Sequence, residues 1–262
     1  MKRTLTTPDF GDFPKSFRPL LEKYPVYDSS CSQDARVFFI GGKGGLFLKT
    51  AARGRLKTEA DMTRYFHGKG LGAEVLNYLS GDADWLLTRA VPGEDCTFLK
   101  YLEDPKRLCD TLALLLRQLH ETDFTGCPVM NRCETYRETA RRNHDRGFCD
   151  LNLFPEKDWG FSSAEEAWQI VQANGKYLKN DTLLHGDYCL PNIMLDDWQF
   201  SGFIDLDSSG AGDKHIDLFW GVWTLFYNLK TNAYYDRFLD TYGRESVEPE
   251  LLRTVAAFEV FG

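Results

Sequence analysis

Residues 183–195 read LLHGDYCLPNIML, and residues 200–205 read FSGFID. Two apolar residues lead into the tripeptide His-Gly-Asp, and Asn192 opens a second apolar run five positions after Asp187. A polar turn separates that run from a third, which we expect to be a strand ending on Asp205. The pattern therefore predicts a β-hairpin with three oxygen-bearing side chains gathered at one end.

These three side chains suit the transfer of a phosphoryl group. An acceptor hydroxyl must be oriented and relieved of its proton, which suits the carboxylate of Asp187. Magnesium ions that bridge nucleotide phosphates need hard oxygen ligands, which suit Asn192 and Asp205. A His-Gly-Asp string alone is also an ordinary turn, but the full spacing, with its apolar flanks and second aspartate, favours a catalytic site.

The string HGDxxxxN, followed by an aspartate after Phe-Ile, resembles the signature of aminoglycoside phosphotransferases, and HGDYCLPNIM resembles their 3′-phosphotransferase branch. The resemblance covers the chain from about residue 20 and is strongest over 183–218. It implies an α+β, protein-kinase-like fold of two lobes. A small antiparallel-sheet lobe, 1–91, would bind nucleotide, and a larger, mostly helical lobe, 92–262, would hold the catalytic loop and the substrate.

The activity implied by this resemblance is that of an antibiotic-resistance kinase. Such an enzyme uses ATP (or GTP) and Mg²⁺ to phosphorylate the 3′-hydroxyl of an aminoglycoside, a cationic small molecule. Two alternatives remain open: a kinase of the same fold for another hydroxylated small molecule, and a non-catalytic nucleotide-binding relative. The presence of Lys49 together with Asp187, Asn192 and Asp205 argues against the non-catalytic alternative.

Local patterns agree with two lobes. Residues 36–40 and 46–49 are β-prone runs joined by a glycine-rich turn, which predicts a hairpin. Helical periodicity follows over 58–66, and a strand over 85–91 is stopped by Pro-Gly. Beyond it, Asp104-Pro105 predicts a helix start, with leucines at 108, 112, 115 and 119 on one face.

The resemblance also assigns the nucleotide site. The strand lysine that holds the α- and β-phosphates would be Lys49, and the helix glutamate that orients it would be Glu59. Main-chain groups of Arg89 and Val91 would bind the adenine edge. The phosphate loop would lie over residues 28–34, with three polar candidates: Ser30, Ser32 and Gln33.

Two further aspartates, Asp213 and Asp217, match family positions after the metal-binding aspartate. We interpret them as structural, with a buried carboxylate that hydrogen-bonds the catalytic-loop backbone and holds its shape. His185 is interpreted as a scaffold residue for the same reason.

The acceptor site matches the family less well. Glu259 and the terminal carboxylate of Gly262 retain part of an acidic C-terminus that would bind substrate ammonium groups, and Asp158 is a further candidate. Positions where the family carries an arginine and an acidic pair hold Trp223, Tyr227 and Asn228 instead. The true acceptor, the phosphorylated hydroxyl, the choice of ATP or GTP and the oligomeric state do not follow from the sequence.

Composition narrows the class further. The chain has 262 residues, 43% of them hydrophobic, and a formal net charge of −8. Such an acidic balance disfavours nucleic-acid partners and anionic lipid surfaces. No apolar run is long enough to span a membrane and no secretory signal is visible, so we expect a cytoplasmic protein. Its seven cysteines include no CxxC pair, which predicts neither a disulfide framework nor a zinc site.

Overall fold

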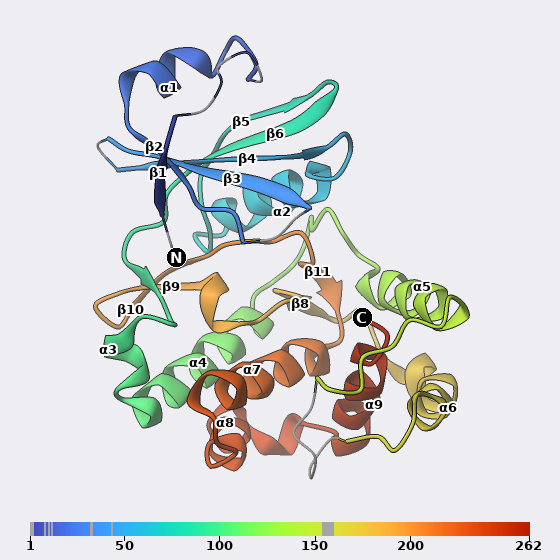
Figure 1. Ribbon diagram of the computed structural model, residues 1–262. Helices are drawn as coiled ribbons and strands as arrows, with labels where there is room; N and C mark the ends of the chain where they lie inside the picture. Colours follow the sequence, from blue (N-terminus) through green and yellow to red (C-terminus); the bar gives the residue numbers. More distant parts are fainter. Residues whose placement is uncertain are drawn as a thin grey trace. The chain divides into compact units, whose positions relative to one another are not determined.

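The computed structural model describes residues 3–7, 9, 11, 13–31, 34–42, 44–153 and 160–262. The chain forms two compact units, each defined by the contacts that its residues make with one another (Figure 1). The first unit comprises residues 1–95 and 191–207, and the second comprises 96–190 and 208–262. The functional division into lobes 1–91 and 92–262 stays a prediction. Among the described residues, no helix has the length and apolar character needed to cross a bilayer.

The first unit is built on a six-stranded sheet in which every pairing is antiparallel, as expected. The strand order is β1-β2-β3-β4-β6-β5. The bounds are β1 (Thr4–Thr6), β2 (Val26–Asp28), β3 (Ala35–Ile40), β4 (Leu46–Ala52), β5 (Val75–Ser80) and β6 (Ala83–Arg89). The predicted hairpin is β3–β4, and the strand predicted over 85–91 ends at Arg89.

Two helices cover opposite faces of this sheet: α1 (Arg18–Lys23) and α2 (Lys57–Gly68) (Figure 1). Side chains alternate across a strand, so Leu48 and its pairing partner Leu87 pack into the core beside α1. Leu86, one position earlier, packs instead in the cluster under α2. Lys49 pairs with Leu86 and therefore faces α2.

The start of α2 is held by Asp84, a fully buried carboxylate on β6. Asp84 accepts hydrogen bonds from Leu56 N at 3.0 Å, Tyr78 Oη at 3.0 Å and Ser80 Oγ at 2.7 Å. Leu56 directly precedes α2, so the carboxylate also stands at the positive end of the helix dipole. This contact fixes where α2 begins and hence where its side chains reach the sheet.

The same unit contains a three-stranded sheet of β10 (Gln199–Phe203), β9 (Ile193–Asp196) and β7 (Glu94–Asp95). The predicted hairpin is β9–β10, with Ile193 opposite Phe203. Phe203 N donates to Leu71 O at 2.8 Å, and the Phe203 ring contacts Phe66 of α2. These contacts tie the end of β10 to α2.

Gly93 lies where the chain passes from the large sheet into this hairpin. Its φ is +87°, and a Cβ placed there would stand 2.1 Å from Leu195 O. Only glycine fits this position, because any side chain would overlap a backbone carbonyl.

The second unit is mostly helical. Its elements are α3 (Leu99–Leu102), α4 (Pro105–His120), α5 (Arg132–Asp145), α6 (Ala164–Asn174), η2 (Gly175–Tyr177), β8 (Thr182–Leu184), β11 (Gly210–Gly212), α7 (Lys214–Leu229), α8 (Tyr235–Tyr242), η4 (Arg244–Ser246) and α9 (Pro249–Glu259). η3 (Leu190–Asn192) leads into β9. Helix α4 packs against α7 and α8, and α9 packs against α5, α6 and α7.

The expected start of α4 is confirmed. Asp104 caps the helix by accepting from Arg107 N at 3.3 Å, and Pro105 occupies its first turn. The buried leucines of α4 are 108, 112, 116 and 119, whereas Leu115 is only half-buried. The predicted face is therefore shifted by one residue in its third turn.

Replacing Asp84 by Ala is expected to lower the free energy of unfolding by about 2–4 kcal/mol, because three donors lose their buried acceptor. Urea denaturation followed by circular dichroism measures the change. Asp82→Ala is the matched control, since Asp82 lies two residues away and is exposed. An Asp84→Ala curve that overlays the control would contradict the anchoring role.

Candidate active site

Lys49 is the centre of the site in the first unit. Its Nζ lies 2.7 Å from Glu59 Oε2 on α2 and 2.8 Å from Asp205 Oδ1 beyond β10. Three residues that the sequence proposed separately are thus in direct contact. The alternation of β4, the anchored start of α2 and the link between α2 and Phe203 together produce this arrangement.

Burial and charge act against each other in this cluster. Burial lowers the pKa of the Lys49 ammonium, but Glu59 and Asp205 raise it, and the net shift is upward. Burial raises the pKa of Glu59 to about 7, although Lys49 acts to lower it. The lysine therefore stays charged, and its orientation depends on two carboxylates rather than one.

Asn192 and Asp205 lie at the same end of the β9–β10 hairpin. Ile204 N donates to Asn192 O at 3.0 Å, which continues the pairing of the two strands by one step. The Asp205 side chain is 52% exposed and engages Lys49 through Oδ1. An amide oxygen and a carboxylate brought together in this way are the hard donors that Mg²⁺ prefers, so the residues present fit a magnesium ion.

The strand that was expected to end on Asp205 ends instead at Phe203. Asp205 itself has a φ of +58°, in the left-handed region. Aspartate tolerates this conformation better than most residues do, at a cost of about 1–2 kcal/mol. Leaving the extended conformation turns the carboxylate out of the strand and toward Lys49.

Other proposed nucleotide contacts lie in the first unit as well. Ser30 Oγ accepts from Val37 N at 3.0 Å, and Ser30 N donates to Asp28 Oδ1 at 2.9 Å. Ser32 and Gln33 lie outside the described residues. Arg89 N donates to Glu74 O at 2.9 Å, so the main-chain amide of Arg89 already has a protein acceptor. Among the described residues, none hydrogen-bonds the main chain of Val91.

The loop that bears Asp187 belongs to the second unit, and a buried carboxylate holds it. Asp217 of α7 is fully buried and accepts from His185 N and Gly186 N, both at 2.7 Å. The interpretation of Asp217 as the residue that holds the catalytic-loop backbone is confirmed. Distances this short are typical of charge-assisted hydrogen bonds.

Gly186 has no substitute in this loop. Its φ is +84°, and a Cβ there would stand 1.9 Å from Ser208 O. The backbone passes too close to its neighbour for any side chain, which explains why glycine separates the histidine from the aspartate.

Asp187 follows at a half-buried position. Its N–H donates to His185 Nδ1 at 3.3 Å, so His185 is a scaffold residue as interpreted. Its carbonyl accepts from Cys189 N at 2.8 Å, and Leu190 N donates to Thr224 Oγ1 of α7 at 3.1 Å. The loop is therefore fixed on both sides of the aspartate.

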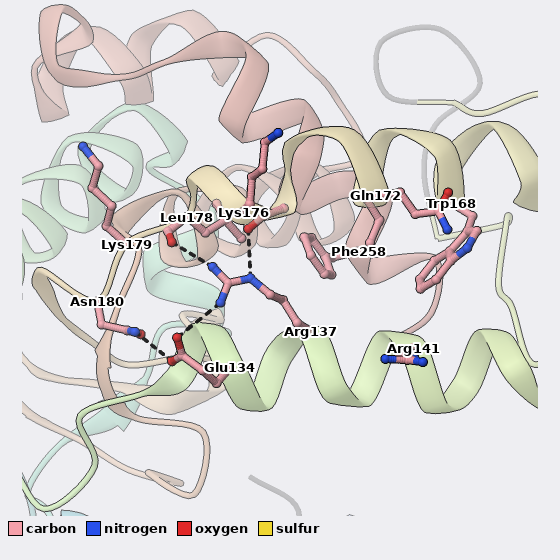
Figure 2. A pocket seen from close by; sticks show the side chains of 12 residues that line it. Glu134, Arg137, Arg141, Trp168, Gln172, Lys176, Leu178, Lys179, Asn180 and Phe258 are labelled. Atoms are coloured by element: carbon pink, nitrogen blue, oxygen red, sulfur yellow. Dashed lines mark hydrogen bonds and ion pairs between the residues drawn. The ribbon is translucent and has the colours of Figure 1, made fainter.

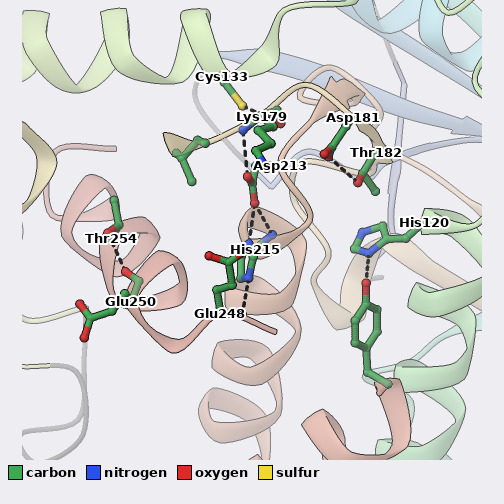
Figure 3. A network of polar contacts seen from close by, with 12 residues as sticks. His120, Cys133, Lys179, Asp181, Thr182, Asp213, His215, Glu248, Glu250 and Thr254 are labelled. Carbon is green, nitrogen blue, oxygen red and sulfur yellow. Dashed lines mark hydrogen bonds and ion pairs between the residues drawn. The ribbon is translucent and has the colours of Figure 1, made fainter. Parts of the chain in front are cut away.

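Asp213 has a related but distinct role (Figure 3). It caps α7, accepting from His215 N at 3.0 Å and His215 Nδ1 at 2.6 Å, and it also accepts from Lys179 N at 2.9 Å. Burial raises the pKa of Asp213, but these hydrogen bonds outweigh it, and the net shift is downward. His215 Nε2 accepts from Glu248 N at 2.9 Å, so its proton lies on Nδ1.

Glu259 is a mostly buried carboxylate at the end of α9. Tyr136 Oη and Trp220 Nε1 both donate to its Oε1, at 2.6 and 3.0 Å. The other oxygen lies beside Gly262, where a Cβ would stand 2.6 Å from it. Among the described residues, none donates a hydrogen bond to Oε2. Every fully buried side-chain oxygen of the described residues has a hydrogen-bond partner, so Oε2 must be accessible to solvent.

Burial raises the pKa of Glu259 to about 7, and the charge of Asp187 adds to this effect, whereas the two hydrogen bonds oppose it. Helix α7 links Glu259 to the catalytic loop, because Trp220 donates to Glu259 and Asp217, three residues earlier on the same helix, holds the loop. Asp158, the third proposed substrate contact, lies outside the described residues.

Helix α7 presents aromatic rings at the positions where the family carries charges. Trp223 and Tyr227 stack with ring centroids 4.9 Å apart, and Trp220 meets Trp223 edge to face. Tyr227 is 53% exposed. Asn228 donates to Thr224 O at 2.8 Å, so its amide serves the helix itself.

An open groove of about 770 Å³ lies elsewhere in the second unit, lined mainly by α5 and α6 (Figure 2). It contains none of the predicted site residues. Arg137 spans it, donating to Gly175 O and Leu178 O, both at 2.9 Å. Arg141, Lys176 and Lys179 add to its positive charge, which does not suit an ammonium-bearing substrate.

Several residues of the site were not found from the sequence. They are His120, Tyr136, Trp220, Thr224 and Tyr242, which contact Asp217, Glu259 or the loop only in the folded chain. The one available signal was His120, which directly follows Leu119, the last leucine of the pattern predicted for this helix.

A lysine paired with a helix glutamate, followed along the chain by an aspartate loop and a hairpin that carries hard oxygen donors, is typical of a phosphotransferase of the protein-kinase-like type. A family model described as "Phosphotransferase enzyme family" matches residues 29–257. The chain is 45% identical to a "Probable aminoglycoside 3′-phosphotransferase" of Lactococcus lactis, over 95% of each chain.

Solved structures agree on the fold. A crystal structure of an aminoglycoside 3′-phosphotransferase of type VIII has a TM-score of 0.72 at 25% identity, covering 94% of this chain and 97% of that one. An aminoglycoside phosphotransferase from Streptomyces rimosus, in complex with ADP and streptomycin, has a TM-score of 0.70 at 22% identity, covering 86% and 90%.

The chain belongs to the phosphotransferase enzyme family and is an enzyme of the kinase type. The resemblance to aminoglycoside 3′-phosphotransferases is confirmed, as is the α+β, kinase-like fold.

Glu259→Gln is expected to change how stability depends on pH. Between about pH 4.5 and 7 the folded protein keeps a proton on Glu259 that the unfolded chain has lost, so this group's contribution falls as pH rises. The variant should therefore gain stability relative to wild type from pH 5 to pH 8, by up to roughly 3 kcal/mol. Urea denaturation at both pH values measures the difference.

Glu250→Gln is the control, because Glu250 lies on the same helix with an exposed side chain. Its curve should stay parallel to wild type. A Glu259→Gln variant that also stays parallel would show that the buried carboxyl is not protonated near neutral pH.

Proposed function

We propose that this enzyme transfers the γ-phosphoryl group of ATP, with Mg²⁺, to the 3′-hydroxyl of an aminoglycoside. The observation that carries the proposal is the Asp187 loop, whose two preceding amides are held by the buried Asp217 carboxylate. The 45% identity to a named aminoglycoside 3′-phosphotransferase, over nearly the whole of both chains, supports the acceptor class.

On the nucleotide side, Lys49 would bind the α- and β-phosphates through an ammonium already oriented by Glu59. Val91 offers an unengaged main-chain amide and carbonyl to the adenine edge, whereas the amide of Arg89 does not, so we assign the main contact to Val91. When bound between the phosphates and the oxygens of Asn192 and Asp205, Mg²⁺ neutralises charge on the transferred group. The complex of a relative of this fold with ADP supports a nucleotide as the donor.

On the acceptor side, Asp187 would orient the hydroxyl and take its proton, because it is the half-buried carboxylate at the tip of the fixed loop. Glu259 would hold a substrate ammonium through Oε2, the oxygen that its own neighbours leave unused. Gly262, at an exposed position beside Oε2, would lie next to the same ammonium.

A second candidate function is a kinase for another hydroxylated small molecule. The stacked rings of Trp223 and Tyr227 favour it. A flat aromatic surface packs well against a ring of the acceptor, whereas several ammonium groups are better bound by carboxylates. Such an acceptor would still use Asp187 but would carry fewer positive charges and would not depend on Glu259.

Asp187→Asn is expected to lower kcat by about 10²- to 10⁴-fold and to leave the KM for ATP nearly unchanged, because Asp187 meets the acceptor rather than the nucleotide. Asp205→Asn should raise the KM for ATP as well. Steady-state kinetics over a range of Mg²⁺ concentrations separates the two effects. Asp196→Asn, at the exposed far end of the same hairpin, is the control. Equal loss of nucleotide affinity in the Asp187 and Asp205 variants would contradict these roles.

ATP consumption across a panel of aminoglycosides and other hydroxylated amines tests the acceptor. We expect turnover with kanamycin-like aminoglycosides and, by NMR of the product, phosphate on the 3′-oxygen. Glu259→Gln should raise the acceptor KM about tenfold without changing the KM for ATP, since one charge-assisted contact is lost. Glu250→Gln should change neither.

The alternative acceptor has a different outcome. Turnover with non-aminoglycoside alcohols alone, or an acceptor KM that is unchanged in Glu259→Gln and rises in Tyr227→Ala, would replace the aminoglycoside by a less charged, ring-bearing substrate.

A further inference from the structure

The Asp217 carboxylate that holds the catalytic loop is itself held from two other helices. His120, the last residue of α4, places Nε2 3.3 Å from Asp217 Oδ2. Tyr242, the last residue of α8, places Oη 2.8 Å from His120 Nδ1. A continuous chain of hydrogen bonds therefore runs from α8 through α4 and α7 to the amides of His185 and Gly186.

The direction of each hydrogen bond follows from the groups involved. Asp217 offers acceptors only, and it already receives two amides. His120 must therefore donate its Nε2 proton to Asp217, and its Nδ1 then accepts from the Tyr242 hydroxyl. The Tyr242 hydroxyl thus selects the His120 tautomer that is able to donate to the carboxylate.

This series of hydrogen bonds is buried away from solvent. Asp217 is fully buried, the His120 side chain is 4% exposed and Tyr242 is 5% exposed. Burial raises the pKa of the Tyr242 hydroxyl, so it remains a proton donor throughout the working pH range. Water is not at hand to replace a lost partner, so each group depends on the next.

Helix α4 holds the loop at a second point. The fully buried Tyr188, which directly follows Asp187, donates its hydroxyl proton to Leu112 O at 2.8 Å. Helix α4 therefore holds the loop on both sides of Asp187. Leu112 binds Tyr188, and His120, eight residues further along the same helix, binds Asp217.

We propose that His120 and Tyr242 are positioning residues of the active site, which act through Asp217 to set the place of Asp187. The proposal rests on the proposed function of Asp187 as the residue that meets the acceptor hydroxyl. Without the third donor, the Asp217 carboxylate has no hydrogen bond to α4, and only the two loop amides orient it. The two loop amides move with it, and a displacement near 1 Å at the reacting group lowers the rate by about a hundredfold.

Two substitutions at residue 120 separate positioning from packing. In His120→Gln the side-chain amide nitrogen takes the place of Nε2 and still donates to Asp217. In His120→Asn the shorter amide takes the place of Nδ1 and leaves Asp217 without its third donor. Both variants are polar and smaller than histidine, so packing changes similarly in the two.

We expect His120→Asn to lower kcat about 10- to 100-fold with the KM for ATP unchanged, and His120→Gln to retain most of the wild-type kcat. Tyr242→Phe should lower kcat about two- to tenfold, the effect of one neutral hydrogen bond. Tyr177→Phe is the control for hydroxyl removal, because Tyr177 is 55% exposed and outside the network.

Amide hydrogen exchange at His185 and Gly186, measured by NMR, provides a readout that does not depend on the acceptor. Exchange at both amides should accelerate at least tenfold in His120→Asn and stay near the wild-type rate in His120→Gln. Equal kcat values and equal exchange rates in the Asn and Gln variants would overturn the proposal.

The same two measurements distinguish this proposal from the proposed function. If Asp187→Asn retains full turnover, the assignment of Asp187 fails, whatever residue 120 does. If Asp187→Asn abolishes turnover while His120→Asn changes neither kcat nor amide exchange, the positioning role alone fails.

Discussion

A carboxylate removed from water must find donors inside the protein, and the donors that Asp217 finds are the two amides that precede Asp187. Leaving a buried hydrogen-bonding group without its partner costs about 1–3 kcal/mol, and more where the group is charged, so the loop has little freedom to take another path. Gly186 makes that path possible, because its backbone runs where no Cβ would fit beside Ser208. The conformation of the catalytic loop is thus set largely by one buried carboxylate and one glycine.

The first unit uses the same principle twice. Asp84 satisfies the start of α2 from within the sheet, and Glu59, three residues into that helix, then meets Lys49 on the facing strand. Asp205 completes the cluster after the chain leaves the extended conformation at the end of β10. Buried carboxylates thus fix the start of α2 and the Lys49 ammonium at defined points, and such preorganisation is what phosphoryl transfer requires of a protein.

The acceptor side combines two kinds of surface. Glu259 gives one oxygen to Tyr136 and Trp220 and presents the other, which makes it a rigid and directional partner for a cation. Helix α7 adds a row of aromatic rings that begins beside this carboxylate with Trp220 and extends through Trp223 to Tyr227. A substrate bound here would meet charge at one point and a flat aromatic surface beyond it. The relative contributions of the carboxylate and of the aromatic surface would decide how many ammonium groups a bound substrate carries.

The sequence by itself determined the kinase-like fold and the candidate residues of the site. The spacing of Asp187, Asn192 and Asp205 could be recognised because a tight loop and a hairpin are local structures, set by residues close together in the chain. The same holds for Lys49 and Glu59, ten positions apart on a strand and the helix that follows it. The antiparallel sheet, the β3–β4 hairpin and the start of α4 were local in the same sense.

Only the tertiary structure decided which side chains support that chemistry. His120 meets Asp217 across 97 positions of the chain, and Tyr136 meets Glu259 across 123. No periodicity or spacing encodes such contacts, because they depend on how helices pack rather than on neighbouring residues. The end of β10 at Phe203 and the left-handed turn at Asp205 are likewise set by contacts with α2 and Lys49. Local sequence patterns predicted the candidate reacting groups, and long-range packing determined where they lie.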